Sequence, residues 1–478
     1  MKICVLQPDY SASTVDYRHY DPPRDLAVIL PQHDVHHVAL DKRTTYRQIK
    51  ALAREGHEVF INLCEGYLEW DVPSIDVIQT LERLDLPFTG PPSHLYDPSK
   101  PLMKYVAHTV GVASPAHALV HDRASARDAA AALRFPLFVK PAHAGDSLGI
   151  DEAALVVDEA ALLTQVTRVL PFHDRLLVEE FIAGREFTVL VLAGSTPGES
   201  SRTFLPIEYR FADSDGFKTY ALKTSELHPS ANVPVTDTQL ASRLQEAARR
   251  VFAAFGGVGY ARMDFRLNAA GELFFLEVNF ACSMFYTDGF EGSADHILRH
   301  DGVGPGGFAE LMVAEGIARH RGRRKRHRMA GNSTAGYGIV ALEALRAGEL
   351  VFRGEERAHR LVTRRHVLTT WDLDSQRTFA RYAVPVDDEI CAYWDADPAE
   401  WAPQNHSCDP NTAYDGLNVV ARREIAEGEE LTFDYGTVMN GVSESFACRC
   451  GAPNCRGTVR GAPGASLSAL EATRRGNA

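Results

Sequence analysis

The sequence predicts two folded regions, an α/β region over residues 1–320 and a mainly-β region that begins near residue 330. In the first region, short apolar runs alternate with segments of helical periodicity, which is typical of α/β proteins. In the second region, strands are short, glycines are frequent and long helical patterns are few. A basic run between them marks the expected boundary.

Length and composition limit the possible classes of protein. The chain has 478 residues, which allows about three domains at roughly 150 residues each. A content of 45% hydrophobic and 24% charged residues is typical of a folded soluble protein and excludes collagen-like and wholly disordered chains. No apolar run reaches about 18 residues, so we expect no membrane helix and no membrane partner. The first residues resemble a strand more than a signal peptide, so we expect a cytoplasmic protein.

The distribution of charge bears on possible partners. A net charge of −13 argues against general nucleic-acid binding. Residues 319–328 nevertheless contain seven Lys and Arg and no acid. Such a run could bind nucleic acid or act as a nuclear signal, or it could be a solvated linker. We favour a linker over residues 321–329, because the run is single and lies at a domain joint. Nucleic acid is therefore not an expected partner.

The elements of the first region follow from periodicity and from turn residues. Ser99-Lys100-Pro101 is typical of a helix start, with proline just inside it. Two later strands, 259–267 and 272–279, are expected to form a hairpin around Asn268-Ala269-Ala270-Gly271. Residues 302–307 are expected to be loop, followed by a helix over 308–318. The other predicted strands are 2–6, 57–63, 136–140, 176–182 and 187–193, and the other predicted helices are 73–85, 101–110, 122–134 and 236–255.

The first candidate site combines a lysine with a glycine-containing loop. Lys140 ends a predicted strand and enters the sequence AHAGDSLGI, in which Gly145 and Gly149 let backbone N–H groups approach phosphates. This pattern alone is common. The next segment, LLVEEFIAGREFTV, is by itself equally compatible with an exposed hairpin edge.

The late hairpin carries candidate metal ligands. Glu277 and Asn279 share one face of their strand because strand side chains alternate with a period of two, and Asp264 can lie across from them. Three oxygen ligands on one sheet face suit Mg²⁺, which also binds phosphate oxygens. Arg262 shares the face of Asp264 and could stabilise developing charge.

Taken in order, the motifs of residues 1–320 resemble the ATP-grasp superfamily, most closely D-alanine–D-alanine ligases. The resemblance implies three subdomains, residues 1–98, 99–190 and 191–320, with ATP held between the last two. It also implies ligation of a carboxylate to an amine through an acyl phosphate, and a possible homodimer. The motifs that carry the resemblance are FINLCEG, PFTGPP, SKPLMKYVAHTVGVASP, PLFVKPAHAGDSLGI, LLVEEFIAGREFTVLVL and the pair ARMDF and FFLEVN.

The resemblance also implies roles for individual residues. Ser147 belongs to the phosphate loop, and Lys218 matches a lysine of the lid over the γ-phosphate. Arg262 matches the arginine near the tetrahedral intermediate. The remaining positions are the phosphate-contacting Lys100 and Lys140, the adenine hinge Glu179, Phe181 and Ile182, the ribose-binding Glu186, and the magnesium ligands Asp264, Glu277 and Asn279.

The chain departs from this family where the amino-acid substrates bind. The N-terminal loop, QPDYSASTVDYRHY, has no clear match to the glutamate that holds the amine of the first D-alanine. The sequence NFACSM over 279–284 replaces the usual Asn-x-Ser-Pro-Gly-Met, and an inserted segment, FYTDGFEG, follows it. We therefore expect ligase chemistry on a substrate other than D-alanine. A bare structural scaffold is the less favoured alternative.

Four cysteines gather near the end of the chain. Cys408 lies in QNHSCDPN, and Cys448, Cys450 and Cys455 lie in CRCGAPNC. In a cytosolic protein, four such thiolates fit one tetrahedral Zn²⁺. The alternative is four unrelated reduced cysteines, which the close and polar spacing disfavours.

Residues 330–460 resemble SET-domain methyltransferases with a cysteine-rich post-SET segment. The resemblance rests on NHSCDPN, EIAEGEELTFDYG and CRCGAPNC, with GYG at 336–338. It implies a SET domain over 330–445 and a post-SET zinc segment over 446–462. The implied fold is a set of small β-sheets with a pseudoknot, which binds S-adenosylmethionine on one side and admits the target amine on the other.

This second resemblance again implies residue roles. Tyr435 would be the catalytic tyrosine, which orients the amine or stabilises developing charge. Zn²⁺ would be structural, held by Cys408, Cys448, Cys450 and Cys455. The S-adenosylmethionine contacts would be Gly336, Tyr337, Gly338, Asn405, His406 and Phe446.

The main hypothesis is a fusion of two enzymes that act on one pathway. An ATP- and Mg²⁺-dependent ligase would join an amino-acid or peptide substrate to an amine, and an N-methyltransferase would methylate an amine of that product or of a protein or carrier. A second hypothesis is a protein-lysine methyltransferase whose ATP-grasp half binds the target or a nucleotide. A third is a nucleotide-sensing scaffold without enzymatic activity.

Overall fold

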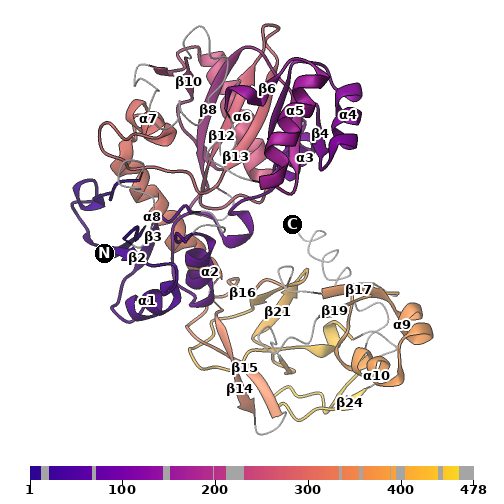
Figure 1. Cartoon of the computed structure of the whole chain (residues 1–478). Helices are drawn as coiled ribbons and strands as arrows, with labels where there is room; N and C mark the ends of the chain where they lie inside the picture. Colours follow the sequence, from indigo (N-terminus) through magenta and orange to yellow (C-terminus); the bar gives the residue numbers. More distant parts are fainter. Residues whose placement is uncertain are drawn as a thin grey trace. The chain divides into compact units, whose positions relative to one another are not determined.

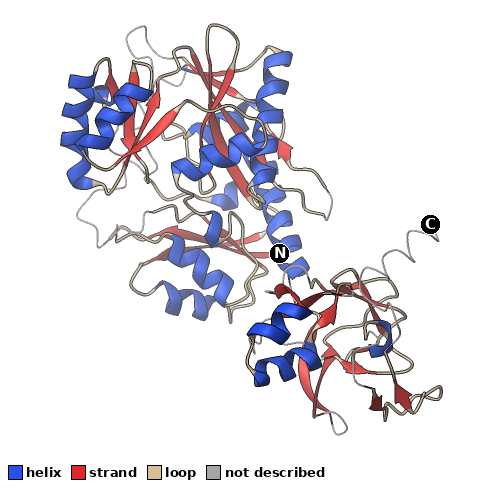
Figure 2. Ribbon diagram, turned by 90° about the vertical axis from the view of Figure 1, so that its right-hand side faces the viewer, coloured by secondary structure: helices blue, strands red, loops and turns tan. Residues whose placement is uncertain are grey.

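The computed structural model describes most of the chain and divides it into two compact units, Met1–Arg323 and Arg324–Ala478. The first unit is α/β and the second consists mainly of strands and loops, which confirms the predicted fold class (Figure 1, Figure 2). None of the described helices combines the length and apolar character needed to cross a membrane. The described residues are 1–11, 21–66, 71–143, 151–196, 199–210, 231–323, 325–332, 336–354, 359–387, 389–394, 404–439 and 445–461.

A three-stranded parallel sheet opens the first unit. Its elements are β1 (Lys2–Pro8), β2 (Asp34–Leu40), β3 (Val59–Asn62), α1 (Thr45–Leu52) and α2 (Ile75–Arg83). The strand order is β2-β1-β3, and α1 and α2 lie beside it in Figure 1. The apolar runs correctly predict β1 and β3. They miss β2, since polar residues such as His36 and His37 interrupt its apolar side chains.

An antiparallel sheet with order β4-β7-β5-β6 follows. Its elements are β4 (His117–Val120), β5 (Leu137–Pro141), β6 (Leu155–Val156), β7 (Leu176–Glu180), α3 (Lys100–Thr109), α4 (Arg123–Ala132) and α5 (Glu159–Val169). The predicted start of α3 is confirmed, because the Ser99 side chain accepts a hydrogen bond from the backbone N–H of Leu102. Helices α4 and α5 pack together beside this sheet (Figure 1).

A second antiparallel sheet completes the first unit, with order β11-β10-β8-β12-β13 and β9 paired to β8. Its elements are β8 (Arg185–Leu192), β9 (Arg202–Thr203), β10 (Ile207–Tyr209), β11 (Asn232–Pro234), β12 (Tyr260–Leu267), β13 (Leu273–Asn279), α6 (Thr238–Ala254) and α7 (Ser293–His300). The predicted hairpin is confirmed: β12 and β13 pair directly, and Gly271 has a φ of 79° in their turn. Residues of β8, β12 and α6 share one buried apolar core.

The long helix α8 (Gly304–Arg323) ends the first unit and differs from the sequence prediction. Residues 304–307 are helical rather than loop, and α8 continues through 321–323, which were expected to be linker. Strand β14 (His327–Asn332) begins soon after. Glycine here permits close packing, because a Cβ on Gly316 would lie 2.5 Å from the carbonyl oxygen of Phe88.

The second unit consists of small sheets. Its strands are β14, β15 (Gly336–Ala341), β16 (Leu350–Phe352), β17 (His359–Thr363), β18 (Val384–Pro385), β19 (Ile390–Trp394), β20 (Asn405–His406), β21 (Thr412–Asp415), β22 (Asn418–Ala421), β23 (Thr432–Phe433), β24 (Phe446–Ala447) and β25 (Thr458–Val459). They pair as β14-β15, β16-β22-β21, β17-β19-β18, β20-β23 and β24-β25. Two short helices, α9 (Arg364–Thr370) and α10 (Leu373–Tyr382), pack beside the β17 sheet. The sequence analysis predicts neither of these helices.

Candidate active sites

The β12–β13 hairpin carries four polar side chains on one face. Its register sets Asp264 opposite Glu277 and Arg262 opposite Asn279. Arg262 Nη2 lies 3.4 Å from Asp264 Oδ2, and only 8% of Arg262 and 9% of Asp264 are exposed. The hairpin therefore brings together the four residues that the sequence analysis selected on this segment.

The buried atoms of this face have unfilled hydrogen-bonding capacity. Within the described ranges, Asp264 Oδ1, Asn279 Nδ2 and Arg262 Nε have no hydrogen-bond partner. A buried carboxylate oxygen without a donor is costly unless a cation or ligand satisfies it. Burial acts to lower the pKa of Arg262. The adjacent carboxylate of Asp264 nevertheless holds this pKa above its ordinary value. The oxygen atoms of Asp264, Glu277 and Asn279 are a chemically suitable set for Mg²⁺.

A buried cluster of lysines lies next to this face. Lys104 Nζ and Lys140 Nζ each lie 2.6 Å from one oxygen of the Glu179 carboxylate. Lys100 Nζ lies 3.9 Å from Glu277 Oε2. Burial acts to raise the pKa of Glu179, but the two lysines hold it down at about 2. Burial lowers the pKa of Lys104 to about 8. The cluster thus connects the two lysines predicted to contact phosphate with one predicted metal ligand.

The segment after β7 forms a stacked hinge. The rings of Phe138 and Phe181 stack with centroids 6.4 Å apart, and the Arg266 guanidinium lies over Phe181 at 4.6 Å. Arg266 also donates a hydrogen bond of 2.9 Å to the carbonyl of Ile182 and lies 3.4 Å from Glu186. Arg266 therefore contacts the two hinge residues that follow Glu179 and the predicted ribose-binding Glu186.

Two predicted nucleotide contacts, Ser147 and Lys218, lie outside the described residues. Two further residues that lie among the predicted nucleotide contacts, Lys104 and Arg266, could not be found from the sequence. Lys104 is a helix residue whose partner Glu179 is distant in sequence, and Arg266 appears only as one more polar residue of an alternating strand. In both cases the contact depends on tertiary packing, for which local sequence patterns give no signal.

In the second unit, β15 and β20 meet around an asparagine. Asn405 Nδ2 donates to the carbonyl of Tyr337 at 3.1 Å and to Glu430 Oε1 at 2.7 Å. A Cβ on Gly338 would lie 2.4 Å from Glu430 Oε1 and 2.7 Å from Asn405 Nδ2. A side chain at position 338 would therefore displace the ends of the Glu430 and Asn405 side chains and disturb this contact. Gly336, Tyr337, Gly338 and Asn405 lie in one neighbourhood, as the sequence analysis expects.

The ring of the predicted catalytic tyrosine packs against those of His406 and Phe446. The centroids of His406, Tyr435 and Phe446 lie 5.4–5.8 Å from one another. The Tyr435 hydroxyl donates to the carbonyl of Gln404 at 2.7 Å, and its backbone N–H donates to His406 Nδ1 at 3.1 Å. The five selected residues Asn405, His406, Cys408, Tyr435 and Phe446 are thus linked through β20, β23 and β24.

The cysteine cluster includes a histidine that the sequence analysis did not assign to the metal. His406, Cys408, Cys448 and Cys450 offer ligand atoms that all lie within 4.8 Å of one another. His406 Nδ1, however, accepts the Tyr435 N–H, so Nε2 carries the ring hydrogen and donates to Cys408 Sγ at 3.3 Å. In this tautomer His406 donates to Cys408 Sγ, whereas with Nε2 deprotonated it would be a fourth candidate ligand beside Cys408, Cys448 and Cys450.

The thiols of the cluster interact closely. Burial acts to raise the pKa of Cys450, but the backbone N–H groups of Cys408 and Ala452 lower it to about 6. Cys455 is within hydrogen-bonding reach of both Cys448 and Cys450, although it is exposed. Three or four thiolates at this spacing suit Zn²⁺. Cys455 as the fourth ligand stays a prediction.

Comparisons with known proteins find one matching family model in each unit. Residues 107–290 match the family model described as the D-ala D-ala ligase C-terminus, and residues 336–436 match the SET domain. The two matches lie in separate units, and after them we call Met1–Arg323 the ligase-like unit and Arg324–Ala478 the SET unit. The cysteine cluster near the C-terminus is compatible with the post-SET segment that the sequence analysis expects.

Relatives and solved structures match the ligase-like unit. The D-alanine–D-alanine ligase of Ectopseudomonas mendocina is 34% identical over 201 residues, which are 42% of this chain and 61% of that protein. D-alanine–D-alanine ligase A of Mesorhizobium japonicum is 32% identical over 222 residues, 45% of this chain and 58% of that protein. The crystal structure of the Bacillus anthracis D-alanine–D-alanine ligase with ATP has a TM-score of 0.49 and 17% identity, and covers 67% of this chain and 99% of that one. The chain thus spans only about three fifths of the curated relatives.

Proposed function

We propose that the chain is a bifunctional enzyme, an ATP-dependent carboxylate–amine ligase fused to an S-adenosylmethionine-dependent N-methyltransferase. The observation that carries the ligase half is the face of β12 and β13, where Arg262, Asp264, Glu277 and Asn279 meet beside the buried lysines. The observation that carries the methyltransferase half is the group of Asn405, His406 and Tyr435 next to the cysteine cluster.

In the ligase half, Asp264, Glu277 and Asn279 would hold Mg²⁺, and Lys100 and Lys140 would contact the phosphates of ATP. When bound, ATP and Mg²⁺ would supply the phosphoryl group that activates a carboxylate and the charge that neutralises the phosphate oxygens. Arg262 would face the oxyanion that forms when the amine attacks, since a buried cation stabilises such charge strongly. Phe181, Ile182 and Glu186 would bind the nucleoside.

In the methyltransferase half, Gly336, Tyr337, Gly338, Asn405, His406 and Phe446 would bind S-adenosylmethionine, which supplies the methyl group. Tyr435 would orient the target amine, since its hydroxyl is already fixed by a backbone carbonyl. Zn²⁺ would hold the post-SET segment against β20 through Cys408, Cys448, Cys450 and Cys455.

The substrate would be a small amino acid or peptide, with the ligated product, a protein or a carrier as methyl acceptor. The curated relatives named D-alanine–D-alanine ligases support an amino-acid substrate. The test is ADP release by the full chain across pairs of amino acids, followed by mass spectrometry with S-adenosylmethionine. We expect ADP with at least one pair and a 14-Da addition to an amine. Absence of ADP with every pair would contradict the ligase half.

A protein-lysine methyltransferase is the second candidate function. One observation favours it: three leucines on neighbouring elements of the SET unit, Leu361, Leu368 and Leu373, are 61%, 61% and 70% exposed and could contact a protein target. In that case the Asp264→Ala substitution would leave methyl transfer to protein lysines unchanged.

A further inference from the structure

A small pocket beside the β12–β13 hairpin has walls from two distant parts of the ligase-like unit. One stretch of wall is residues 65–66, which follow β3, and the other is residues 278–283 together with Arg262. The two stretches touch where the Ser283 hydroxyl donates to Glu65. Since Arg262 is proposed to act in ligation, a substrate would lie in this pocket. The separation of the two stretches should then decide which substrates fit.

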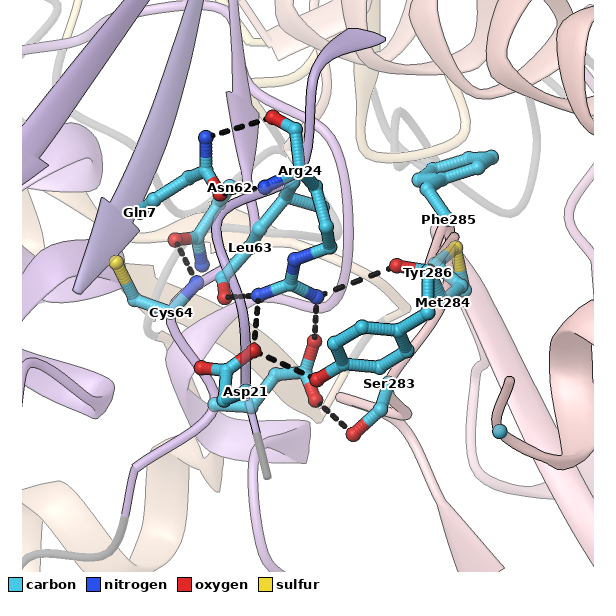
Figure 3. A network of polar contacts seen from close by, with 12 residues as sticks. Gln7, Asp21, Arg24, Asn62, Leu63, Cys64, Ser283, Met284, Phe285 and Tyr286 are labelled. Carbon is cyan, nitrogen blue, oxygen red and sulfur yellow. Dashed lines mark hydrogen bonds and ion pairs between the residues drawn. The ribbon is translucent and has the colours of Figure 1, made fainter. Parts of the chain in front are cut away.

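One buried arginine, Arg24, contacts both stretches of wall. Its side chain is only 1% exposed. Nη2 donates to the carbonyl of Leu63 at 3.0 Å and lies 3.0 Å from Asp21, whereas Nη1 donates to the carbonyl of Met284 and to Glu65, both at 3.2 Å (Figure 3). Each terminal nitrogen thus lies against two acceptors. The rigid, planar guanidinium holds these acceptors at a defined separation, which the compact ammonium of a lysine cannot do.

The backbone of Arg24 is also held in place. Gln7, near the end of β1, accepts a hydrogen bond from the Arg24 N–H at 2.8 Å and donates one to the Arg24 carbonyl at 2.9 Å (Figure 3). Gln7 is only 9% exposed. Any movement of Arg24 relative to the sheet would break buried hydrogen bonds, which is costly. Arg24 is therefore a fixed brace between the N-terminal sheet and the pocket walls.

The second stretch of wall runs into a strained turn. Phe285 has a φ of 67°, which is uncommon for a bulky residue, and its N–H donates to Asp295 Oδ1 at 2.5 Å. The next ring, that of Tyr286, lies 4.7 Å from the Arg24 guanidinium, and its hydroxyl donates to Asp21 at 2.7 Å (Figure 3). Backbone strain persists only where surrounding contacts enforce it, and it is frequent at ligand sites. Arg24 and Asp295 provide such contacts here.

We propose that Arg24 is a positioning residue that sets the separation of the two stretches of wall and thereby the size of the substrate that the pocket accepts. Among the described residues, Arg24 is not part of the pocket lining, so it acts through the segments that it holds. The inference rests on the proposed ligase function and adds a residue that determines its specificity. Without the guanidinium, residues 281–284 would relax away from Leu63, and the pocket would admit a longer side chain.

The test compares ADP release by the full chain with the amino acid that it uses best and with the analogue longer by one methylene. Wild-type protein should prefer the shorter one by at least about 10-fold in kcat/KM. Arg24→Lys, which keeps the charge and loses the span, should reduce this preference to less than about 3-fold and change the KM for ATP by less than about 2-fold. A partly unfolded sample would leave the ratio of two substrates unchanged. The exposed Arg47, changed to Lys, is the matched control.

A milder variant covers the case in which Arg24→Lys does not fold. Tyr286→Phe keeps the ring beside Arg24 and removes only the hydroxyl that donates to Asp21. It should lower the preference for the shorter amino acid by about 2-fold to 3-fold. Tyr46→Phe, at an exposed position of α1, should keep the wild-type preference.

Equal use of both amino acids by the wild type would overturn the inference and leave the ligase function intact. An unchanged preference in Arg24→Lys, or in Tyr286→Phe where Arg24→Lys does not fold, would overturn it as well. If no substrate pair yields ADP, the ligase proposal fails, and amide hydrogen exchange of the full chain decides the inference separately. Faster exchange over 281–286 in Arg24→Lys or Tyr286→Phe, but not in the control variants, supports the brace, and equal exchange contradicts it.

Discussion

At Glu179, two lysines share one buried carboxylate, each 2.6 Å from a different oxygen. Lys140 is the lysine predicted to contact phosphate, so Glu179 holds it in place before any nucleotide binds. Lys104 completes the arrangement from helix α3 and is only 1% exposed. Such a site is sensitive to loss of a single partner, because a buried charge without compensation is strongly unfavourable.

The Lys104→Met substitution tests this arrangement. Removing the ammonium leaves one Glu179 oxygen buried without its ion pair, so the free energy of unfolding of the ligase-like unit should fall by about 2 kcal/mol. Urea unfolding followed by far-ultraviolet circular dichroism, which reports mainly the helix-rich ligase-like unit, measures it. The exposed lysine of helix α1, in the Lys50→Met variant, should change stability by less than about 0.5 kcal/mol.

The double variant Lys104→Met, Glu179→Gln distinguishes a lost ion pair from lost packing. With the carboxylate neutral, losing the lysine should cost at least about 1 kcal/mol less than it costs in the wild-type background. Strictly additive effects of the two substitutions would show that Lys104 contributes through packing alone.

The sequence predicts those residues of the ligase-like site whose positions follow from local backbone geometry. A period of two correctly places Glu277 and Asn279 on one face, with Asp264 opposite, because strand alternation is a local property. The contact of Lys104 with Glu179 and the stacking of Arg266 on Phe181 join segments far apart in sequence. No local pattern encodes them, so sequence reasoning does not find them.

Among the secondary-structure elements, helix α8 begins earlier and ends later than its sequence prediction. Its glycines are typical of loops, but Gly306 and Gly316 face carbonyl oxygens of the N-terminal part, at 2.8 Å and 2.5 Å from where a Cβ would lie. Tertiary packing therefore explains these glycines, and helix propensity alone misplaces the start of α8. Arg319 of the basic run likewise donates to the carbonyls of Phe88 and Gly90.

Alanine substitutions at two α8 glycines distinguish the effect of close packing on stability from the effect of helix propensity. Gly316→Ala forces a methyl group against the backbone of Phe88 and should lower the free energy of unfolding by about 1–3 kcal/mol. Gly322→Ala, where a Cβ meets nothing within 4 Å, should leave stability unchanged or raise it by up to about 1 kcal/mol. Both are measured by urea unfolding. Equal effects of the two would contradict close packing of α8.

Over the whole molecule, the chain comprises two compact units with separate cores and separate candidate sites. The change in sequence texture near residue 330 and the clustering of four of the eight cysteines are sufficient to predict this division. Details within the units are not predictable in the same way. The hydrogen bond from the Tyr435 N–H to His406 Nδ1, for example, joins segments brought together by the parallel pairing of β20 with β23.

The two units should respond differently to removal of metal. We expect about one Zn²⁺ per chain, lost in Cys448→Ser and Cys455→Ser and kept in Cys391→Ser, whose thiol lies outside the cluster. A chelator should lower the Tm of the SET unit and leave that of the ligase-like unit unchanged, since only the former contains the cluster. Zinc analysis and calorimetry provide the readouts. Full zinc content in Cys455→Ser would exclude Cys455 as a ligand.

The central claim is that one chain carries two independent chemistries, and a crossed pair of variants tests it most directly. ADP release and methyl transfer are measured together for wild type, Asp264→Asn and Tyr435→Phe with ATP, Mg²⁺, S-adenosylmethionine and the amino-acid panel. The structure predicts that Asp264→Asn lowers ADP release at least about 100-fold and spares methyl transfer to a preformed product or protein amine. Tyr435→Phe should lower methyl transfer and leave ADP release unchanged. Two results would contradict a two-enzyme fusion. One is full ADP release in Asp264→Asn together with full methyl transfer in Tyr435→Phe, and the other is a wild type with neither activity.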